Sequence, residues 1–518
     1  MRRIGLYISA LAAIIVLLAA FHSNTTRAAR HYEDARGCDW FGYLRQAQLF
    51  RKNGLVGGLD TAIRDDRTAY LVRVAKSFNV DPKKWDHRVS PHCHHYKPRV
   101  DRVVNQYPPG TGFVQSFFPE ETQARWTQVA SSLVILAALF FVIARSKTAM
   151  VPWLAIALGA FCFLGMHRYF WGRSIQPSVA FSVLIGGLTV ATCLASTSSR
   201  RALSAGALGL LIGLATSMRL PNLLLAAGPA IVLGLTTLRR PWRDPAGFVL
   251  VAMIAAGLIP VLAANAVNAG HPFATTYSWT DAIPPSVWRI PEGLKFYFVK
   301  SGTDGFYFIA ATAVLAVALI VDVYWRTPGI RPAIIAAAIN LFVGTGYVAG
   351  HIHHFGYYLM PFSVATAATA VFCLIAIANA EARSRSHASV PTIAQVGIVA
   401  ISLGIAVMLP RQVSMPVSPH FAQPSPAVPF ESNSIVWADH ATGAISYFLD
   451  RQAAVLPFMA LELQDRFFET IDRDGVPQYV VMDSDRMKLT FERLAERHDL
   501  RLVGTTFGYD TFLIRLRL

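Results

Sequence analysis

The chain of 518 residues is 53% hydrophobic and only 15% charged, and its mean hydropathy is +0.40. Ordinary soluble domains carry roughly 25% charged residues, so lipid is the expected solvent for most of this chain. The formal net charge of +16 does not indicate nucleic-acid binding, because the Lys and Arg residues lie between apolar segments rather than in one tail or stripe. Five cysteines without a CxxC pattern exclude a dense disulfide framework.

Apolar segments long enough to cross a bilayer run through most of the chain. A membrane-spanning helix needs about 17 to 25 mainly apolar residues. Eleven segments meet this requirement: 4–22, 126–144, 150–167, 174–195, 202–218, 220–238, 246–266, 306–325, 331–350, 356–379 and 391–410. The pair 202–218 and 220–238 is separated by Arg219, Pro221 and Asn222, and the two runs can instead form one re-entrant element. The pattern predicts an all-α polytopic membrane protein with about 11 transmembrane helices.

Basic residues in the short connections give the orientation, because cytoplasmic loops are enriched in Lys and Arg. One side of the predicted topology carries Arg2, Arg3, Arg145, Lys147, Arg200, Arg201, Arg239, Arg240, Arg243, Arg326, Arg331, Arg383 and Arg385. We expect this side to be cytoplasmic, with the N-terminus inside and the C-terminus outside. The outer face then receives residues 23–125, residues 267–305 and everything after about residue 411. Residues 1–28 can also be interpreted as a cleaved signal peptide.

The C-terminal tail predicts a small extracytoplasmic α/β domain. We divide the chain into a transmembrane domain at 1–410, a proline-rich linker at 411–430 and an α/β domain at 431–518. Within the last part, 434–438 and 478–482 have the composition of buried strands. Residues 442–451, 459–474 and 486–498 have helical spacing, and 501–516 predicts a hairpin.

A carboxylate-bearing stretch follows the first apolar segment. Residues 37–47 read Gly-Cys-Asp-Trp-Phe-Gly-Tyr-Leu-Arg-Gln-Ala and predict an amphipathic helix just beyond the membrane. Asp39 at that place can take a proton from the hydroxyl of an incoming acceptor. Asp39 can equally be a helix N-cap, whose side chain accepts hydrogen bonds from backbone N–H groups.

The order of motifs along the chain resembles GT-C superfamily glycosyltransferases, especially bacterial relatives of the protein O-mannosyltransferases and of the lipid A aminoarabinose transferases. The stretch 37–47 resembles the segment after their first helix, and Asn105-Gln106-Tyr107-Pro108-Pro109-Gly110-Thr111-Gly112 resembles their Tyr-Pro-Pro-Gly segment. Three weaker similarities are the helix junction 219–222, the loop entry 268–273 and the Tyr-Leu-x-Pro segment 354–361.

This resemblance implies an inverting transferase in the bacterial cytoplasmic membrane. It would move a sugar from a polyprenyl-phosphate donor to a hydroxyl on a glycan, lipid or protein acceptor at the outer face. Asp39 is then the general base, with Asp34 and Glu33 as nearby substitutes. No nucleic-acid partner is expected.

Cationic groups would stabilise the departing lipid phosphate. The candidates predicted near outer helix ends are Arg168, Arg173, Arg219 and Lys300, together with His353 and His354 before the Tyr-Leu-x-Pro segment. Any of the four cations can instead be an interfacial residue with its charge in the headgroups. Trp40, Tyr43, Tyr107 and Tyr357 are the candidates to line the substrate site, although Tyr and Trp also form interfacial belts.

No metal ligand set is assigned from the sequence. Several GT-C relatives carry a second acid in the next outer loop, but residues 166–177 contain neither Asp nor Glu, so a metal shared between two acids is unsupported. His87, His92, His94 and His95 surround Cys93, and His351 lies beside the later pair, yet neither cluster has HExxH or paired-Cys spacing. No cofactor is certain, and a divalent metal remains an unsupported option.

A disulfide between Cys38 and Cys93 competes with any metal role for Cys93. Both cysteines lie in the polar stretch after the first apolar segment, and an oxidising compartment would preserve the bond. Closing a loop of about 54 residues would stabilise the fold by roughly 4 kcal/mol.

Two other classes of function fit the same helices. A lipid or solute transporter or flippase would need charged residues near the bilayer midplane and often an inverted repeat. A non-catalytic envelope-assembly protein would tolerate the loss of Asp39. The polar residues are concentrated in outer loops instead, which favours the transferase.

Overall fold

The computed structural model describes residues 2–30, 37–168, 174–239, 244–277, 283–300, 304–351, 356–384, 428–449, 451–456, 459 and 461–516. The chain forms two compact units. The helical unit contains Met1–Arg30, Ala124–Pro260 and Ile283–Met415. The mixed α/β unit contains His31–Gln123, Val261–Ala282 and Pro416–Leu518. Each unit is therefore built from three separate stretches of the chain.

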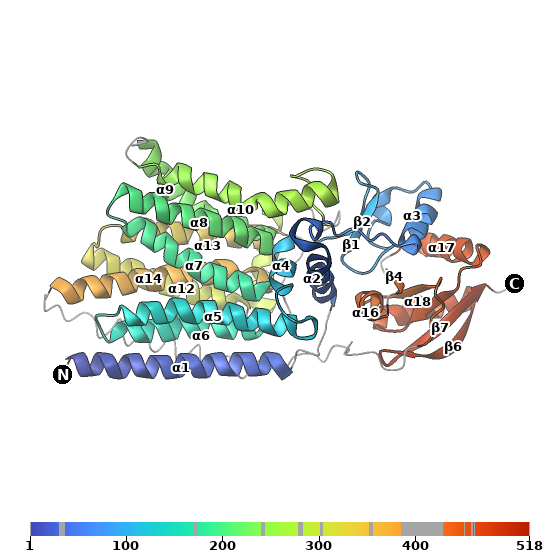
Figure 1. Ribbon diagram of the computed structural model, residues 1–518, viewed down its shortest axis with the longest axis horizontal. Helices are drawn as coiled ribbons and strands as arrows, with labels where there is room; N and C mark the ends of the chain where they lie inside the picture. The colour runs from blue at the N-terminus through green and yellow to red at the C-terminus, as the bar shows by residue number, and fades with distance from the viewer. Residues whose placement is uncertain are drawn as a thin grey trace. The chain divides into compact units, whose positions relative to one another are not determined.

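Long apolar helices make up the helical unit and lie side by side in Figure 1. They are α1 (Arg2–Arg30), α5 (Gln123–Ala144), α6 (Met150–Arg168), α7 (Ile175–Leu194), α8 (Ser198–Met218), α9 (Ala227–Arg239), α10 (Ala246–Ala269), α12 (Asp304–Trp325), α13 (Ile330–Gly350) and α14 (Met360–Ser384). Short turns connect some of them: η3 (Leu220–Ala226), η4 (Val287–Arg289), α11 (Ile290–Lys295), the π-helical η5 (Phe296–Lys300) and η6 (Gly356–Tyr358).

The predicted spans agree with these helices. Nine helices in the part of the chain that the structure describes are long and apolar enough to cross a membrane, and Met150–Met166 adds a shorter apolar one. The two runs on either side of Arg219 form separate helices rather than one re-entrant element. The eleventh predicted span, 391–410, lies outside the described residues. The chain is a multi-pass membrane protein.

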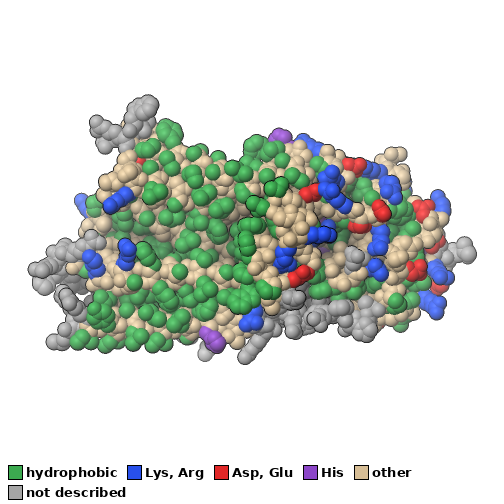
Figure 2. All heavy atoms as spheres, in the orientation of Figure 1, with side chains coloured by type: hydrophobic (Ala, Val, Ile, Leu, Met, Phe, Trp, Pro, Cys, Tyr) green, Lys and Arg blue, Asp and Glu red, His purple; other side chains and the backbone are tan. Residues whose placement is uncertain are grey.

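The surface of the helical unit is apolar, as a lipid solvent requires. In Figure 2 hydrophobic side chains are spread over the visible face of this unit, and few charged side chains lie among them. Phe342 is 82% exposed, Leu238 72% and Ile259 63%, and such side chains would be costly in water. On the same face, charged side chains gather over the elements of the mixed α/β unit.

Two pairs of the basic connections lie next to each other in the helical unit. The backbone N–H of Lys147, after α5, donates to the side-chain oxygen of Asn379 near the end of α14 at 2.9 Å. Gly329, before α13, has φ 84°, and a Cβ there would lie 2.5 Å from the carbonyl oxygen of Cys193 near the end of α7. Only glycine tolerates both conditions. These contacts are the ones expected if the basic loops share one side of the membrane.

The mixed α/β unit starts with the first polar stretch of the chain. Its elements are α2 (Gly37–Gly57), α3 (Asp66–Ser77), η1 (Pro82–Lys84), β1 (His94–Lys97), β2 (Arg102–Asn105), α4 (Pro109–Gln115) and η2 (Glu120–Thr122). β1 and β2 pair antiparallel, with His95 opposite Val104. Helix α2 is kinked at Gly54, where φ is 69° and only glycine is unstrained.

The tail adds a five-stranded sheet with helices. Its elements are β3 (Ile435–Ala438), α16 (Thr442–Phe448), β4 (Gln452–Val455), α17 (Leu461–Arg473), β5 (Gln478–Val481), α18 (Asp485–Arg497), β6 (His498–Thr506) and β7 (Tyr509–Leu516). The strand order is β4-β3-β5-β7-β6. β3 pairs in parallel with β4 and β5, whereas β7 pairs antiparallel with β5 and β6. The predicted strands, helices and hairpin are all present, and β4 is the element that the sequence analysis missed.

The first polar stretch and the tail share one hydrophobic core. Trp85, from the loop before β1, belongs to the same buried cluster as Trp437 of β3 and Phe467 of α17. Side chains also join the two stretches by hydrogen bonds: the Thr68 hydroxyl donates to the Gln452 side-chain oxygen at 2.8 Å. A tail of about 90 residues is marginal alone, and this shared core supplies apolar burial that it lacks.

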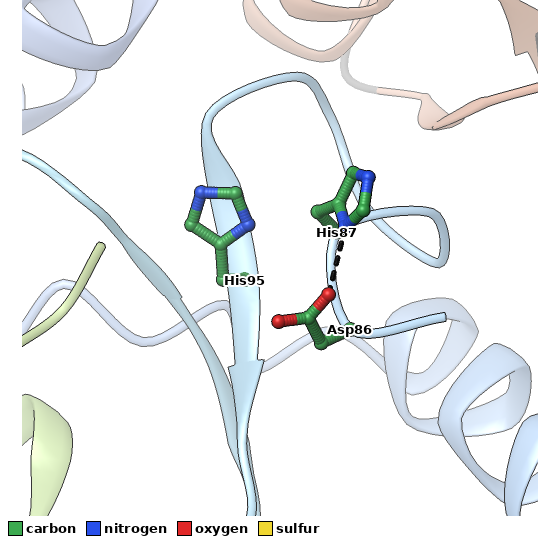
Figure 3. Close-up of side chains that lie close together, drawn as sticks. All are labelled: Asp86, His87 and His95. Carbon is green, nitrogen blue, oxygen red and sulfur yellow. Dashed lines mark hydrogen bonds and ion pairs between the residues drawn. The ribbon is translucent and has the colours of Figure 1, made fainter. Parts of the chain in front are cut away.

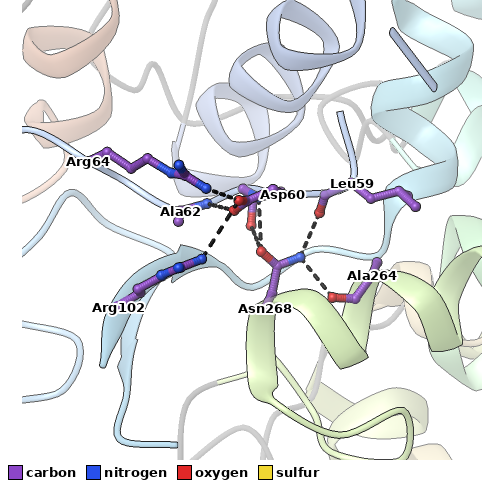
Figure 4. Close-up of polar contacts among 8 residues, drawn as sticks. Leu59, Asp60, Ala62, Arg64, Arg102, Ala264 and Asn268 are labelled. Carbon is purple, nitrogen blue, oxygen red and sulfur yellow. Dashed lines mark hydrogen bonds and ion pairs between the residues drawn. The ribbon is translucent and has the colours of Figure 1, made fainter. Parts of the chain in front are cut away.

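Asn268, in the last turn of α10, ties a third stretch of the chain into the mixed α/β unit (Figure 4). Its side-chain oxygen accepts from the backbone N–H and the hydroxyl of Thr61 at 2.9 and 3.1 Å. Its amide nitrogen donates to the carbonyls of Leu59 and Ala264 at 2.7 and 2.8 Å. Every polar atom of this buried amide therefore has a partner, and replacement by an apolar residue would leave buried groups unpaired.

Asp483 gives the sheet a pH-dependent stability. Its carboxylate follows β5 and accepts hydrogen bonds from the backbone N–H groups of Asp439, at 3.0 Å, and Ala441. Burial raises the pKa of Asp483 to about 6, despite these bonds, and the neighbouring Asp439 carboxylate adds to the rise. The folded state therefore binds this proton more tightly than the unfolded chain. The stabilising contribution is complete below about pH 4 and is lost as the pH rises through about 6, with a magnitude on the order of 3 kcal/mol.

We predict that Asp483→Asn is less stable than the wild type at about pH 5, because one backbone N–H would then face the amide nitrogen. At about pH 7.5 the difference in the free energy of unfolding should shrink, because the wild type buries a charge there and the variant does not. Thermal unfolding of both proteins in detergent at the two pH values measures this. Asp485→Asn is the control, because Asp485 is 95% exposed on the next helix. Parallel pH profiles for wild type and Asp483→Asn would contradict the prediction.

Candidate active site

The two strongest sequence motifs pack directly on each other. Gly42 of α2 lies against Tyr107, and a Cβ at Gly42 would lie 2.5 Å from a Tyr107 ring carbon. A Cβ at Gly112 of α4 would likewise lie 2.5 Å from the Gln46 side chain. The Asn105 amide donates to the Gly42 carbonyl at 2.6 Å, and the Gln46 amide donates to the Tyr107 carbonyl at 3.2 Å. The glycines are required here because the two segments leave no room for a side chain.

Tyr107 is the centre of this contact. Its ring lies 4.5 Å from that of Tyr43, centroid to centroid, and its hydroxyl donates to the Cys93 sulfur at 3.1 Å. Tyr43 and Tyr107 are only 2% and 7% exposed. The structure therefore gives these two rings a packing role, and contact of either with a substrate stays a prediction.

Cys93 is disulfide-bonded, as the sequence analysis predicted for this residue. Cys162, Cys193 and Cys373, which lie in the apolar segments, are free. The side chain of Cys38, the predicted partner, lies outside the description, so the pairing itself stays a prediction.

Asp39 is the third residue of α2. The structure describes the backbone of Asp39 and Trp40 but not their side chains. The following residue, Phe41, is buried and lies 6.2 Å from the Tyr447 ring and 6.0 Å from the Phe448 ring, both of α16. The N-terminal part of α2 thus packs, through Phe41, against the tail. An acid in the first turn of this helix is also favoured by the helix dipole.

Arg219 packs against two adjacent aromatic rings in the helical unit. It follows the last residue of α8, and its guanidinium carbon lies 4.8 Å and 4.7 Å from the ring centroids of Tyr357 and Tyr358. The Asn222 amide, in the next turn, donates to the Ala215 carbonyl at 2.9 Å and to the Ser178 hydroxyl at 3.1 Å. Two further motifs, 219–222 and the Tyr-Leu-x-Pro segment, therefore meet at one arginine. Cation–π contacts with two neighbouring rings, whose centroids are 4.8 Å apart, restrict the position of its charge.

The structure says little about the other candidates for binding the donor phosphate and for the substitute base. Lys300 is the exposed last residue of η5. Arg168 ends α6, but its side chain lies outside the description. Arg173, His353, His354, Asp34 and Glu33 also lie outside the described residues. Their assignments stay predictions.

A group of possible metal ligands lies in the first polar stretch (Figure 3). One ligand atom from each of Asp86, His87 and His95 lies within 4.8 Å of the other two. The sequence analysis considered His87 and His95 but missed Asp86, because the three residues have no recognised motif spacing. The only feature of the sequence that indicates this group is the adjacent pair Asp86-His87, followed by His95 in a strand.

His94 and His95 point to opposite sides of β1 and are both buried. Burial lowers the pKa of His94 to about 3, helped by the positive charge of Arg45. Burial also lowers the pKa of His95 to about 4, against a hydrogen bond to Gln106 that raises it. Both imidazoles are therefore neutral at physiological pH.

We predict that Gly42→Ala destabilises the protein by about 1–3 kcal/mol, because the new methyl group displaces the buried Tyr107 ring. Helix propensity alone would favour alanine by about 1 kcal/mol, so the sign of the effect tests the contact. Gly346→Ala in α13 is the control, since nothing lies within 4 Å of its added Cβ. Thermal unfolding of the two variants measures the difference. If Gly42→Ala is as stable as Gly346→Ala, the close packing of the two motifs is wrong.

Comparison with known proteins identifies the fold. No family model and no curated protein sequence matches the chain. Among solved structures, ArnT from Cupriavidus metallidurans in the apo state superposes with a TM-score of 0.52 at 13% identity, over 97% of each chain. ArnT from the same organism bound to undecaprenyl phosphate gives 0.50 at 14% identity, again over 97% of each chain. The resemblance to GT-C enzymes is therefore confirmed at the level of the fold: this chain has the polytopic membrane fold of ArnT.

Proposed function

We propose that this protein is an inverting glycosyltransferase that moves a sugar from a polyprenyl-phosphate donor to a hydroxyl acceptor. The observation that carries the proposal is the likeness to ArnT over almost the whole of both chains, including a structure bound to undecaprenyl phosphate. A lipid phosphate is the product that a polyprenyl-phosphate sugar donor releases. The likeness extends through the mixed α/β unit as well as the helices, because 97% of each chain is covered.

In the proposed reaction, Asp39 is the general base. Its carboxylate removes the proton from the acceptor hydroxyl as the oxygen attacks the anomeric carbon. The bond from that carbon to the donor phosphate oxygen breaks, and the electron pair leaves with the lipid phosphate. The new glycosidic bond then has inverted configuration. The support for this role is the motif itself and the packing of Phe41, two residues after Asp39, against the tail.

Arg219 is the best candidate to bind the donor phosphate. A leaving phosphate needs charge stabilisation more than a proton, and an arginine fork can meet two phosphate oxygens at once. The support is that the adjacent rings of Tyr357 and Tyr358 both pack against the guanidinium. A charge held in place loses little freedom on binding, which is the advantage of preorganisation.

We place the reaction on the outer face of a bacterial cytoplasmic membrane, with the N-terminus inside. The support is the basic composition of the connections after α5, α7, α9 and α12. The disulfide at Cys93 fits an oxidising compartment for the first polar stretch. The acceptor is a glycan, lipid or protein hydroxyl.

We predict that Asp39→Asn slows sugar transfer by about 100- to 10,000-fold, the usual contribution of a general base. The assay incubates the purified full chain with a panel of radiolabelled polyprenyl-phosphate sugars and measures donor consumption. Asp66→Asn is the matched control and should retain activity, because Asp66 is an exposed acid in the first turn of α3. Asp34→Asn and Glu33→Gln test the two substitute bases, and a loss of activity in either that equals the loss in Asp39→Asn would move the role to that residue. Normal transfer by Asp39→Asn would rule out this base. No turnover of any donor by the wild type would instead favour a transporter or an assembly protein.

Arg219→Gln should slow transfer by about 100- to 1,000-fold, as expected when a group that stabilises developing charge is removed. Arg219→Lys keeps the charge but loses the planar fork, so we expect an intermediate rate and a raised KM for the donor. Arg145→Gln is the control, since Arg145 also stacks on an aromatic ring, 4.6 Å from the centroid of Phe141, but lies after α5 outside the motifs. Equal losses in Arg145→Gln and Arg219→Gln would mean that the effect is structural.

A further inference from the structure

The loop before β1 is held firmly against that strand. Trp85 is fully buried, its ring lies 4.9 Å from that of Tyr96, and its indole N–H donates to the Val80 carbonyl at 3.2 Å. The Tyr96 backbone N–H donates to the Asp86 carbonyl at 2.6 Å. These contacts on either side bring Asp86 and His87 beside His95 of β1, and they make the placement a property of the packed core.

The three side chains converge, as Figure 3 shows. The ring nitrogen Nδ1 of His87 lies 2.7 Å from Oδ1 of Asp86. The ring centroids of His87 and His95 are 6.0 Å apart. Two ligands of a tetrahedral zinc ion are about 3.3 Å apart, given bonds of about 2.0–2.1 Å. Because the three ligand atoms already lie within 4.8 Å of one another, movements of about 1 Å would close them around an ion.

His95 presents an unprotonated nitrogen to this cluster. Its Nε2 lies 2.7 Å from the side-chain oxygen of Gln106. An amide oxygen only accepts hydrogen bonds, so Nε2 carries the proton and Nδ1 of the neutral ring has a free lone pair. Figure 3 shows Nδ1 on the side of the ring that faces His87 and Asp86. Gln106 thus plays the part of the outer hydrogen-bond partner that usually fixes a metal-binding histidine.

The Nδ1 atom of His95 is buried and has no hydrogen-bond partner among the described residues. His95 is only 4% exposed, so water does not readily supply one. A buried acceptor without a partner costs about 1–3 kcal/mol, and native structures seldom retain one without a reason. A metal ion bonded to this atom would remove that cost and would also neutralise the Asp86 carboxylate, whose side chain is 10% exposed.

We propose that Asp86, His87 and His95 form a binding site for a zinc-type divalent metal ion, with water as the fourth ligand. Two imidazoles and one carboxylate suit zinc, whereas calcium and magnesium prefer oxygen ligands alone. The His87 side chain is 21% exposed, which leaves a path for the ion and for the water. The site is independent of the proposed sugar transfer, since it involves neither Asp39 nor Arg219.

The test measures zinc on the untagged full chain in detergent. The protein is stripped with a chelator, titrated with Zn²⁺ and desalted, and its metal is measured by mass spectrometry. We expect about one tightly bound Zn²⁺ per chain and, with Co²⁺ in its place, the strong visible absorption of a four-coordinate ion. Removal of the outer partner in Gln106→Ala should weaken binding by about 10- to 100-fold, and removal of a ligand in His87→Ala by more than that.

The control is His271→Ala, because His271 is an exposed histidine of the same unit and is not part of the cluster. It should bind zinc as the wild type does. His87 is chosen for substitution because it is the more exposed of the two histidines, so we expect the variant to fold. Thermal unfolding of the metal-free proteins checks that it does. Wild type without saturable zinc binding, or equal binding by the wild type and His87→Ala, would overturn the proposal. Tighter binding of Mg²⁺, Mn²⁺ or Fe²⁺ than of Zn²⁺ would overturn the choice of metal, because sites with nitrogen ligands ordinarily bind zinc more tightly than these ions.

Discussion

The core shared by the first polar stretch and the tail determines how the mixed α/β unit can fold. Trp85, Trp437 and Phe467 are each buried to below 1% exposure in one cluster, although more than 300 residues separate the first from the others. Contacts this distant in sequence stabilise a fold only after the chain between them is already arranged, since loop closure costs entropy first. The tail therefore contributes to the position of α2, because Phe41 packs against α16. Loss of the tail would release the first turn of the helix that carries Asp39.

Local signals made most of the elements predictable. About 20 consecutive apolar residues can cross a bilayer only as a helix, so the spans could be read from composition without any knowledge of their neighbours. The strands β3 and β5 have apolar β-branched and aromatic residues between turns, and they too were predicted. In contrast, β4 contains two alanines and begins with Gln452, so nothing in its own residues distinguishes it from a helix. Its strand conformation comes from pairing with β3. The shared core could not be predicted at all, because a hydrophobic pattern shows which face is buried but not against what.

The candidate site was predictable to the extent that it lies within motifs. The order of motifs predicted roles for Asp39 and Arg219, and the structure adds that the guanidinium of Arg219 packs against the rings of Tyr357 and Tyr358. For Tyr107 the structure adds a buried contact between two motifs, which the sequence did not predict, and its contact with a substrate stays a prediction. The cluster of Asp86 with His95 depends on a backbone hydrogen bond between Tyr96 and Asp86 and on burial of Trp85. Neither the hydrogen bond nor the burial of Trp85 produces a recognisable spacing of residues in the sequence.

The convergence on Tyr107 has a consequence for catalysis. A general base acts only within hydrogen-bond reach of the proton it removes, so small displacements of the helix that carries it cost rate. Tyr107 belongs to the Tyr-Pro-Pro-Gly segment. Its ring packs against Gly42 of α2, and its hydroxyl donates to the sulfur of Cys93, which directly precedes β1. Three stretches that would otherwise move separately are thus fixed around one side chain. The glycines and the buried tyrosine of the motif are then explained as supports for the geometry of α2. If Asp39 is the base, as proposed, a substitution at Tyr107 would act on the rate through that geometry even without contact with the sugar.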